Sequence, residues 1–96
     1  MPLYALIAHD RPGLEHRKQH RSAHLEHMAK LDASGRIRYG GPLLNDQKDM
    51  VGSLIIIEAD SLDEAKTTYA DDPYVIHNVF DHYDVVETMP VFPRAN

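Results

Sequence analysis

The sequence contains no cysteine, which excludes a disulfide framework, a thiolate metal site and a cysteine nucleophile. The N-terminus also lacks the basic start and long apolar run of a signal peptide. No apolar run approaches the length that crosses a membrane, so no membrane association is expected. These absences predict a cytoplasmic protein.

An excess of positive charge is missing as well, since 15 acidic residues face 10 basic ones and the net charge is −5 with histidine neutral. Binding to nucleic acid requires a basic surface, so this balance argues against it. Seven histidines are present, and protonation of all of them would change the net charge from −5 to +2. The charge of the protein should therefore respond to pH near the usual histidine pKa of about 6.5.

The length of 96 residues suits one domain and is too short for two. We expect a single domain over residues 1–96, with a core at about 3–88 and a proline-punctuated tail at 89–96. A hydrophobic content of 43% and a charged content of 26% are ordinary for a folded globular protein.

Apolar patterning predicts the order strand, helix, strand, strand, helix, strand. Ser61 and Glu64 fit a capping box at the start of the second helix, and Asp72 precedes a short helical turn that Pro73 begins. The segment Gly40-Gly41-Pro42 is expected to end the second strand, and 43–50 to form a polar loop. The predicted strands are 3–8, 36–39, 51–58 and 83–88, and the predicted helices are 14–33 and 61–70.

The first helix is indicated by a stretch from Leu14 to Ala33 without proline, glycine or β-branched residues. At about 100° per residue, one side of this helix collects several apolar residues together with an arginine and a histidine. This side is formed by Leu14, Arg21, His24, Leu25, Met28, Ala29 and Leu31.

Right-handed crossovers fold this order into an α+β domain of βαββαβ type, with a four-stranded antiparallel sheet and both helices on one face. The opposite face would remain uncovered, although its residues include Leu, Ile and Val. A second sheet packed about 10 Å away would cover it. The sequence therefore predicts a homodimer.

Two residues are candidates for chemistry. His24 lies on the apolar side of the first helix, either as a core histidine bonded to a backbone carbonyl or as a functional imidazole. Asp72 can cap the short helix after it and can also orient and charge an imidazole, and the two roles are compatible.

Other patterns are weaker. His16, His20 and His24 follow one another at i, i+4 spacing, but no third ligand of known type and no HExxH motif accompanies them, so we expect no metal site. Gly40-Gly41-Pro42 could be a turn or could leave room for a ligand. It lacks the features of a phosphate loop, and no serine-nucleophile elbow is present.

Four pieces of sequence resemble the YCII-related (YciI-like) family over roughly Leu3 to Glu87. They are Arg21-Ser22-Ala23-His24-Leu25, Gly35, Gly41-Pro42 and Asp72-Pro73-Tyr74. The resemblance implies a ferredoxin-like fold, a dimeric α+β barrel and a His–Asp active-site pair at His24 and Asp72. One branch of the family dehydrochlorinates a chlorinated hydroxyhydroquinone, and muconolactone isomerases and small monooxygenases share the fold.

The chain departs from the family pattern in two places. Tyr74 stands where phenylalanine is common, which would change the polarity of the pocket. The segment 75–79 lacks the Ala-Gly pair often found there, which bears on the shape of the substrate.

These observations favour an enzyme without a cofactor that acts on a small cyclic, acidic molecule by lyase-type elimination or isomerisation. His24 would be the general acid/base and Asp72 its orienting partner. Arg21 would bind a phenolate or carboxylate, with Gly41, Pro42 and Tyr74 as further substrate-binding residues. The alternative is a non-catalytic small-molecule-binding or interaction module in which His24 and Asp72 form a structural pair.

Overall fold

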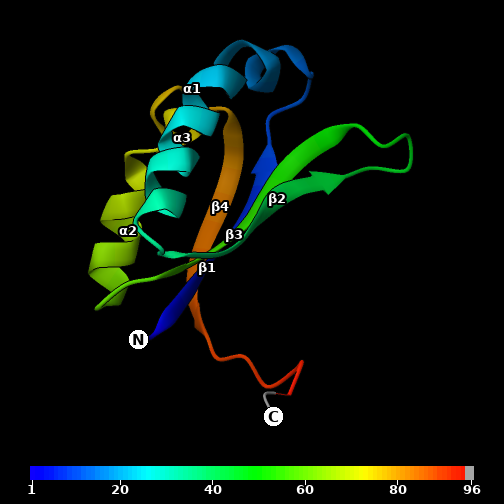
Figure 1. Cartoon of the computed structure of the whole chain (residues 1–96). Helices are drawn as coiled ribbons and strands as arrows, with labels where there is room; N and C mark the ends of the chain where they lie inside the picture. Colours follow the sequence, from blue (N-terminus) through cyan, green and yellow to red (C-terminus); the bar gives the residue numbers. More distant parts are fainter. Residues whose placement is uncertain (95–96) are drawn as a thin grey trace.

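The computed structural model describes residues 1–94 and contains a four-stranded antiparallel sheet with helices packed on one face (Figure 1). This arrangement confirms the α+β, βαββαβ prediction. The elements are β1 (Leu3–Asp10), α1 (Glu15–Ala33), β2 (Ile37–Leu44), β3 (Met50–Glu58), α2 (Leu62–Ala70), α3 (Pro73–Ile76) and β4 (Phe80–Thr88). Within the described chain, no helix combines the length and apolar character needed to cross a bilayer.

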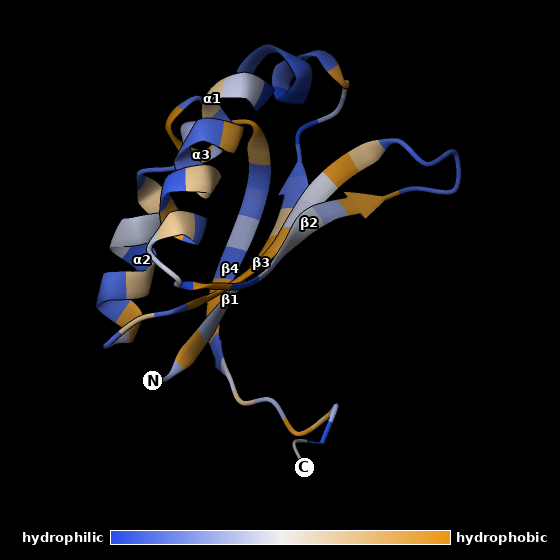
Figure 2. Cartoon of the chain, viewed as in Figure 1, coloured by the Kyte–Doolittle hydropathy of each residue, from blue (hydrophilic) through white to orange (hydrophobic). Residues whose placement is uncertain are grey.

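The strand order is β2-β3-β1-β4, which makes β1 and β3 the central strands. The central position explains the run of isoleucines in β3, because Ile55 and Ile57 are buried against the helices while Ile56 points to the other face. Figure 2 shows the hydrophobic residues gathered along these central strands.

The core lies between the central strands and the helices, and Tyr69 of α2 connects the two layers. Its hydroxyl donates to the carbonyl oxygens of Tyr4 at 2.8 Å and Ile55 at 3.0 Å, one on each central strand. Burial raises the pKa of Tyr69, so this hydroxyl remains a donor. The bonds hold α2 on the sheet.

The face of the sheet away from the helices carries apolar side chains as well. Ile7 pairs with Leu54 and Tyr39 with Ile56, and these pairs alternate with the residues that face the core. Ile7 and Tyr39 are 39% and 49% exposed. In the described chain, the helices leave uncovered a sheet face on which these apolar residues lie beside the charged Asp84, the partner of Ile7 on β4. An uncovered face that carries apolar residues is what the sequence predicted.

Three strand boundaries differ from the sequence-based prediction by two residues or more. β1 continues to Asp10 instead of ending at 8, because His9 and Asp10 still pair with neighbouring strands. β2 continues through Gly40-Gly41-Pro42, and the loop after it is only 45–49. Because β2 is an edge strand, Pro42 can lie in it without removing a bond from the middle of the sheet. β4 begins at Phe80, earlier than expected, because Phe80 packs into the core and pairs with Asp10.

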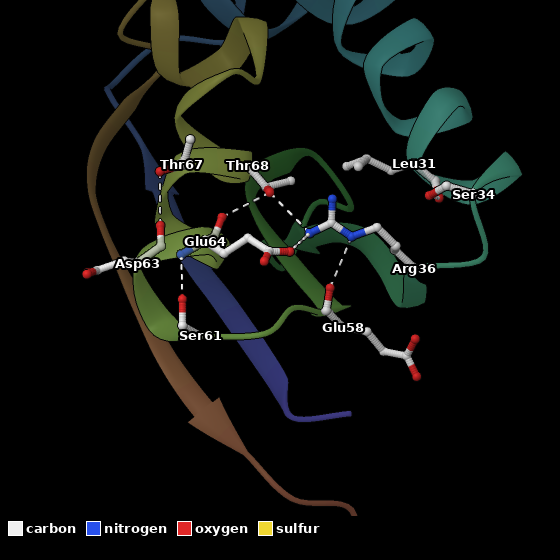
Figure 3. A network of polar contacts seen from close by, with 9 residues as sticks. All are labelled: Leu31, Ser34, Arg36, Glu58, Ser61, Asp63, Glu64, Thr67 and Thr68. Atoms are coloured by element: carbon white, nitrogen blue, oxygen red, sulfur yellow. Dashed lines mark hydrogen bonds and ion pairs between the residues drawn. The ribbon is translucent and has the colours of Figure 1, made fainter.

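The predicted capping box forms only in part. The Ser61 hydroxyl accepts from the backbone N–H of Glu64 at 3.1 Å, as expected. The Glu64 carboxylate instead pairs at 3.2 Å with Arg36, which also donates to the carbonyl of Glu58 and the hydroxyl of Thr68 (Figure 3). The network joins the start of β2 to α2.

Candidate active site

A cavity of about 520 Å³ lies between α1 and the sheet. Side chains of α1 form one wall, β2 and β3 form the other, and Tyr74 from α3 contributes to the lining. Both the volume and the mixture of apolar walls with a few polar groups are typical of a small-molecule site, for which roughly 300–1,000 Å³ is usual.

His24 lines this cavity and contacts Asp72. His24 Nδ1 lies 2.9 Å from each carboxylate oxygen of Asp72. Asp72 is 2% exposed and also accepts from the backbone N–H of Tyr74 at 2.9 Å, so it caps α3 and holds the imidazole at once. A carboxylate only accepts, so Nδ1 donates in this contact; in the neutral form of the ring, Nε2 is then the acceptor, on a ring that lines the cavity.

Tyr74 fixes the plane of the imidazole. Its ring stacks on His24 with centroids 3.9 Å apart and an angle of 10° between the planes. Burial raises the pKa of the Tyr74 phenol, while the charges of Arg17 and Arg21 act in the opposite direction. Tyr74 is therefore a neutral hydroxyl at the wall of the cavity near neutral pH.

Arg17 was missed by the sequence analysis. It is the buried residue of α1, at 5% exposure, and it donates to the two carboxylate oxygens of Asp10 at 2.7 and 2.9 Å and to the Ser53 hydroxyl at 2.9 Å. Its guanidinium carbon lies 4.6 Å from the centre of the Tyr74 ring. The available signal was helical spacing, since 17, 21 and 24 share one face. Residue type gave no signal, because arginine is seldom buried unless its charge is paired.

The structure brings together the residues that the sequence analysis singled out. Arg21, Gly41, Pro42 and Tyr74 line the same cavity as His24. Arg21 is exposed, and among residues 1–94 no carboxylate forms an ion pair with it. It is therefore an uncompensated cation beside the imidazole.

The packed side of α1 is only partly as predicted. Leu25 and Ala29 were placed on the apolar side of this helix, but both are exposed and line the cavity, with Leu25 at 46%. The middle of α1 lies over a hollow rather than on the sheet. A side chain at Gly40 would place its Cβ 3.1 Å from the terminal carbon of Met28, so glycine preserves space between β2 and α1.

The remaining histidines of α1 do not form a row of adjacent imidazoles. His20 instead stacks on His77, with centroids 4.1 Å apart and planes 5° from parallel. Burial, followed by the charges of His77 and His16, lowers the pKa of His20. In the described part of the chain, no three His, Cys, Asp or Glu side chains are placed to hold a metal ion.

The chain matches known proteins over nearly its whole length. The YCII-related domain matches residues 2–89. Protein YciI of Escherichia coli O6:H1 and protein YciI of Shigella flexneri are each 35% identical over 97 residues, which cover 94% of this chain and 99% of theirs.

Among solved structures, 5-chloro-2-hydroxyhydroquinone dehydrochlorinase from Burkholderia phenoliruptrix, in complex with 2,5-dihydroxybenzoquinone, is 37% identical, with a TM-score of 0.78 and coverage of 88% of this chain and 90% of that one. An uncharacterized NIPSNAP domain protein from Burkholderia xenovorans is 15% identical, with a TM-score of 0.54 over 100% of both chains, and shares the fold alone. Both the sequence and the fold thus lead to one conclusion: the chain belongs to the YCII-related family.

Proposed function

We propose that this chain is a small cofactor-independent enzyme of YciI-like type that performs acid–base chemistry on a small cyclic, acidic substrate, as a lyase or an isomerase. One observation carries the proposal. A buried carboxylate holds the imidazole of His24 by Nδ1 at 2.9 Å, at the wall of a cavity large enough for a substituted ring. The cytoplasmic location expected from the sequence is part of the same proposal.

In this proposal each residue of the site has a role. Nε2 of His24 accepts a proton from a ring hydroxyl, and Asp72 stabilises the resulting imidazolium while keeping its orientation. Arg21, the uncompensated cation, binds the phenolate oxygen that forms. If a ring carbon carries a halogen, the imidazolium can return the proton to that carbon, which forms a C–H bond and a keto tautomer of the ring. A second ring hydroxyl then loses its proton, and its electron pair expels the halide, so the elements of the acid HX leave without any change that requires a redox cofactor.

The dehydrochlorinase supports this choice of substrate. It is 37% identical to the chain, acts on a chlorinated, hydroxylated ring, and was solved with an oxygenated ring of similar size. Gly41 and Pro42 border the cavity from β2, and Tyr74 replaces the phenylalanine common in the family. The extra hydroxyl makes the lining of the cavity more polar at Tyr74, which is compatible with an oxygenated ring as substrate.

The test is to measure chloride release from 5-chloro-2-hydroxyhydroquinone by wild type, His24→Ala and His27→Ala. Loss of a general acid/base should lower kcat by about 10²–10⁴-fold. His27 is on the same helix but does not line the cavity, so its removal should leave turnover unchanged. Full activity of folded His24→Ala would overturn the proposal. The non-catalytic binding module would be favoured if the wild type binds 2,5-dihydroxybenzoquinone but releases chloride from no member of a panel of chlorinated phenols.

We further propose that the enzyme is a homodimer whose apolar sheet faces pack together at about 10 Å. The face carries Ile7 at 39% exposure near the middle of β1. A charge there would be buried unpaired in the dimer, so Ile7→Glu should give a monomer in multi-angle light scattering. Leu62 on α2 is equally exposed, at 38%, but lies on the helical side, so Leu62→Glu should leave the dimer intact. A wild-type monomer, or a dimeric Ile7→Glu variant, would contradict the arrangement.

A further inference from the structure

We infer that Arg17 is a positioning residue that fixes the reactive imidazole through the ring of Tyr74. The inference rests on the proposed function, because it concerns the same His24–Asp72 pair. The contacts form a series from Arg17 to Tyr74 to His24, and each step of the series is a distance in the structure.

The first step is that Arg17 cannot move freely. Its Nε and Nη2 donate to the two oxygens of Asp10 at 2.7 and 2.9 Å, and Nη2 also donates to Ser53 at 2.9 Å. The side chains of Arg17 and Asp10 are only 6% and 7% exposed. Asp10 ends β1 and Ser53 lies in β3, so the two central strands of the sheet fix the plane of the guanidinium.

The second step joins this guanidinium to the ring of Tyr74. The two are 4.6 Å apart, within the range of a cation–π contact, and such contacts strengthen when both partners are desolvated. Tyr74 is 0% exposed and meets Phe80 edge-on at 5.8 Å on another side. The ring is therefore held by side chains from α1 and β4, although it belongs to a helix of only four residues.

The third step joins Tyr74 to both members of the pair. Its ring stacks on His24 at 3.9 Å, and its backbone N–H donates to Asp72 at 2.9 Å. A displaced Tyr74 would thus move the imidazole and the carboxylate together. Since a misplacement of about 1 Å can lower a rate by about 10²-fold, the rigidity of Arg17 bears on turnover.

This role requires the shape of arginine, because a positive charge alone would not hold the ring of Tyr74. The guanidinium is planar and offers a fork that matches a carboxylate, while it also lies flat against an aromatic ring. The ammonium of lysine can pair with Asp10 but has no plane to lie on Tyr74. Arg17→Lys therefore keeps the positive charge that neutralises the buried side chain of Asp10, but it removes the planar group that contacts the ring of Tyr74.

The experiment compares Arg17→Lys with Arg38→Lys, a matched change at an arginine that pairs with Glu58 and does not line the cavity. Three quantities are measured: kcat and KM for chloride release, and the NMR resonance of the His24 Nδ1 proton, which is visible while Asp72 protects it from exchange. Arg17→Lys should lower kcat by about 10–100-fold, change KM by less than about threefold, and shift or broaden the His24 resonance. Arg38→Lys should change none of these.

A second set of variants covers the case in which Arg17→Lys does not fold. Tyr74→Leu removes the ring but leaves the Arg17–Asp10 pair, and it should lower kcat to a similar extent, whereas Tyr74→Phe should keep most of the His24 signal. If both single variants fold, the double variant Arg17→Lys/Tyr74→Leu should lose little more than either alone, because residues that act through one path are not additive.

Several results would overturn the inference. An unchanged kcat and an unchanged His24 resonance in Arg17→Lys would do so, as would a rise in KM alone, which would make Arg17 a substrate-binding residue. If Tyr74→Leu keeps the wild-type kcat and the wild-type His24 resonance, Tyr74 does not connect Arg17 to His24. If wild type shows no turnover, the proposed function fails separately, and the His24 resonance in these variants still decides whether Arg17 positions the imidazole.

Discussion

Replacement of Asp72 by asparagine changes one atom of the site and should separate catalysis from folding. The amide oxygen can still accept from the backbone N–H of Tyr74, so the cap of α3 is kept. The amide nitrogen only donates, and His24 Nδ1 must then become an acceptor, with its proton on Nε2. The base that faces the cavity is lost, and kcat should fall by about 10⁴-fold, the scale seen when the orienting carboxylate of a catalytic triad becomes an amide.

The stability of the same variant should change little. A hydrogen bond to a charged group contributes about 1.5–3 kcal/mol, and the neutral bond that replaces it recovers about 1 kcal/mol. The net loss is then about 1 kcal/mol, which corresponds to a fall in Tm of about 4–8 °C for a domain of this size. Asp72→Ala should cost more, because it removes the cap and leaves the half-buried imidazole of His24 without its partner.

The assay measures chloride release and thermal unfolding on the same preparations of wild type, Asp72→Asn and Asp72→Ala. A folded Asp72→Asn variant that turns over within threefold of wild type would refute the argument about the tautomer. Retained turnover together with a fall in Tm well beyond the calculated range would identify His24 and Asp72 as a structural pair instead.

Two further predictions concern stability. Gly52→Ala would place its Cβ against the backbone oxygen of Ala8, so the central strands must separate. Chemical denaturation should then show that the free energy of unfolding falls by at least about 2 kcal/mol. A smaller fall would show that the sheet can adjust. Burial, followed by the charges of His77 and His16, lowers the pKa of His20 in the folded protein. The unfolded chain therefore binds a proton at His20 more readily than the folded one does. The free energy of unfolding should fall as the pH drops below about 6.5, the usual pKa of histidine. His20→Gln should therefore lose less Tm than wild type between about pH 7.5 and 5.5, and an equal loss would contradict this.

Most elements could be predicted from local features. The absence of β-branched residues, proline and glycine predicted the first helix to within one residue of its start, and Ser61 and Asp72 marked the helices that follow them. The apolar run in β3 predicted a central strand. These features act within a few residues of the chain, so they can be detected without the fold.

Boundaries that depend on neighbouring strands could not be predicted in the same way. Gly40-Gly41-Pro42 has the composition of a turn, yet it pairs with β3, because an edge strand accepts a proline that a central strand would not. Phe80 begins β4 because its ring enters the core next to Tyr74. In both cases, long-range contacts outweigh local preference.

The amino-acid sequence by itself determined the order of elements, the family and the two residues of the candidate pair, since each depends on residue type and spacing. Tertiary structure alone decided that a carboxylate 48 positions away lies 2.9 Å from the imidazole, that Arg17 is buried, and that α1 covers a cavity rather than a packed core. The physical reason is that burial and pairing of charge depend on which groups the completed fold places together. A buried arginine is stable only because Asp10 and Ser53, distant in the chain, satisfy its donors.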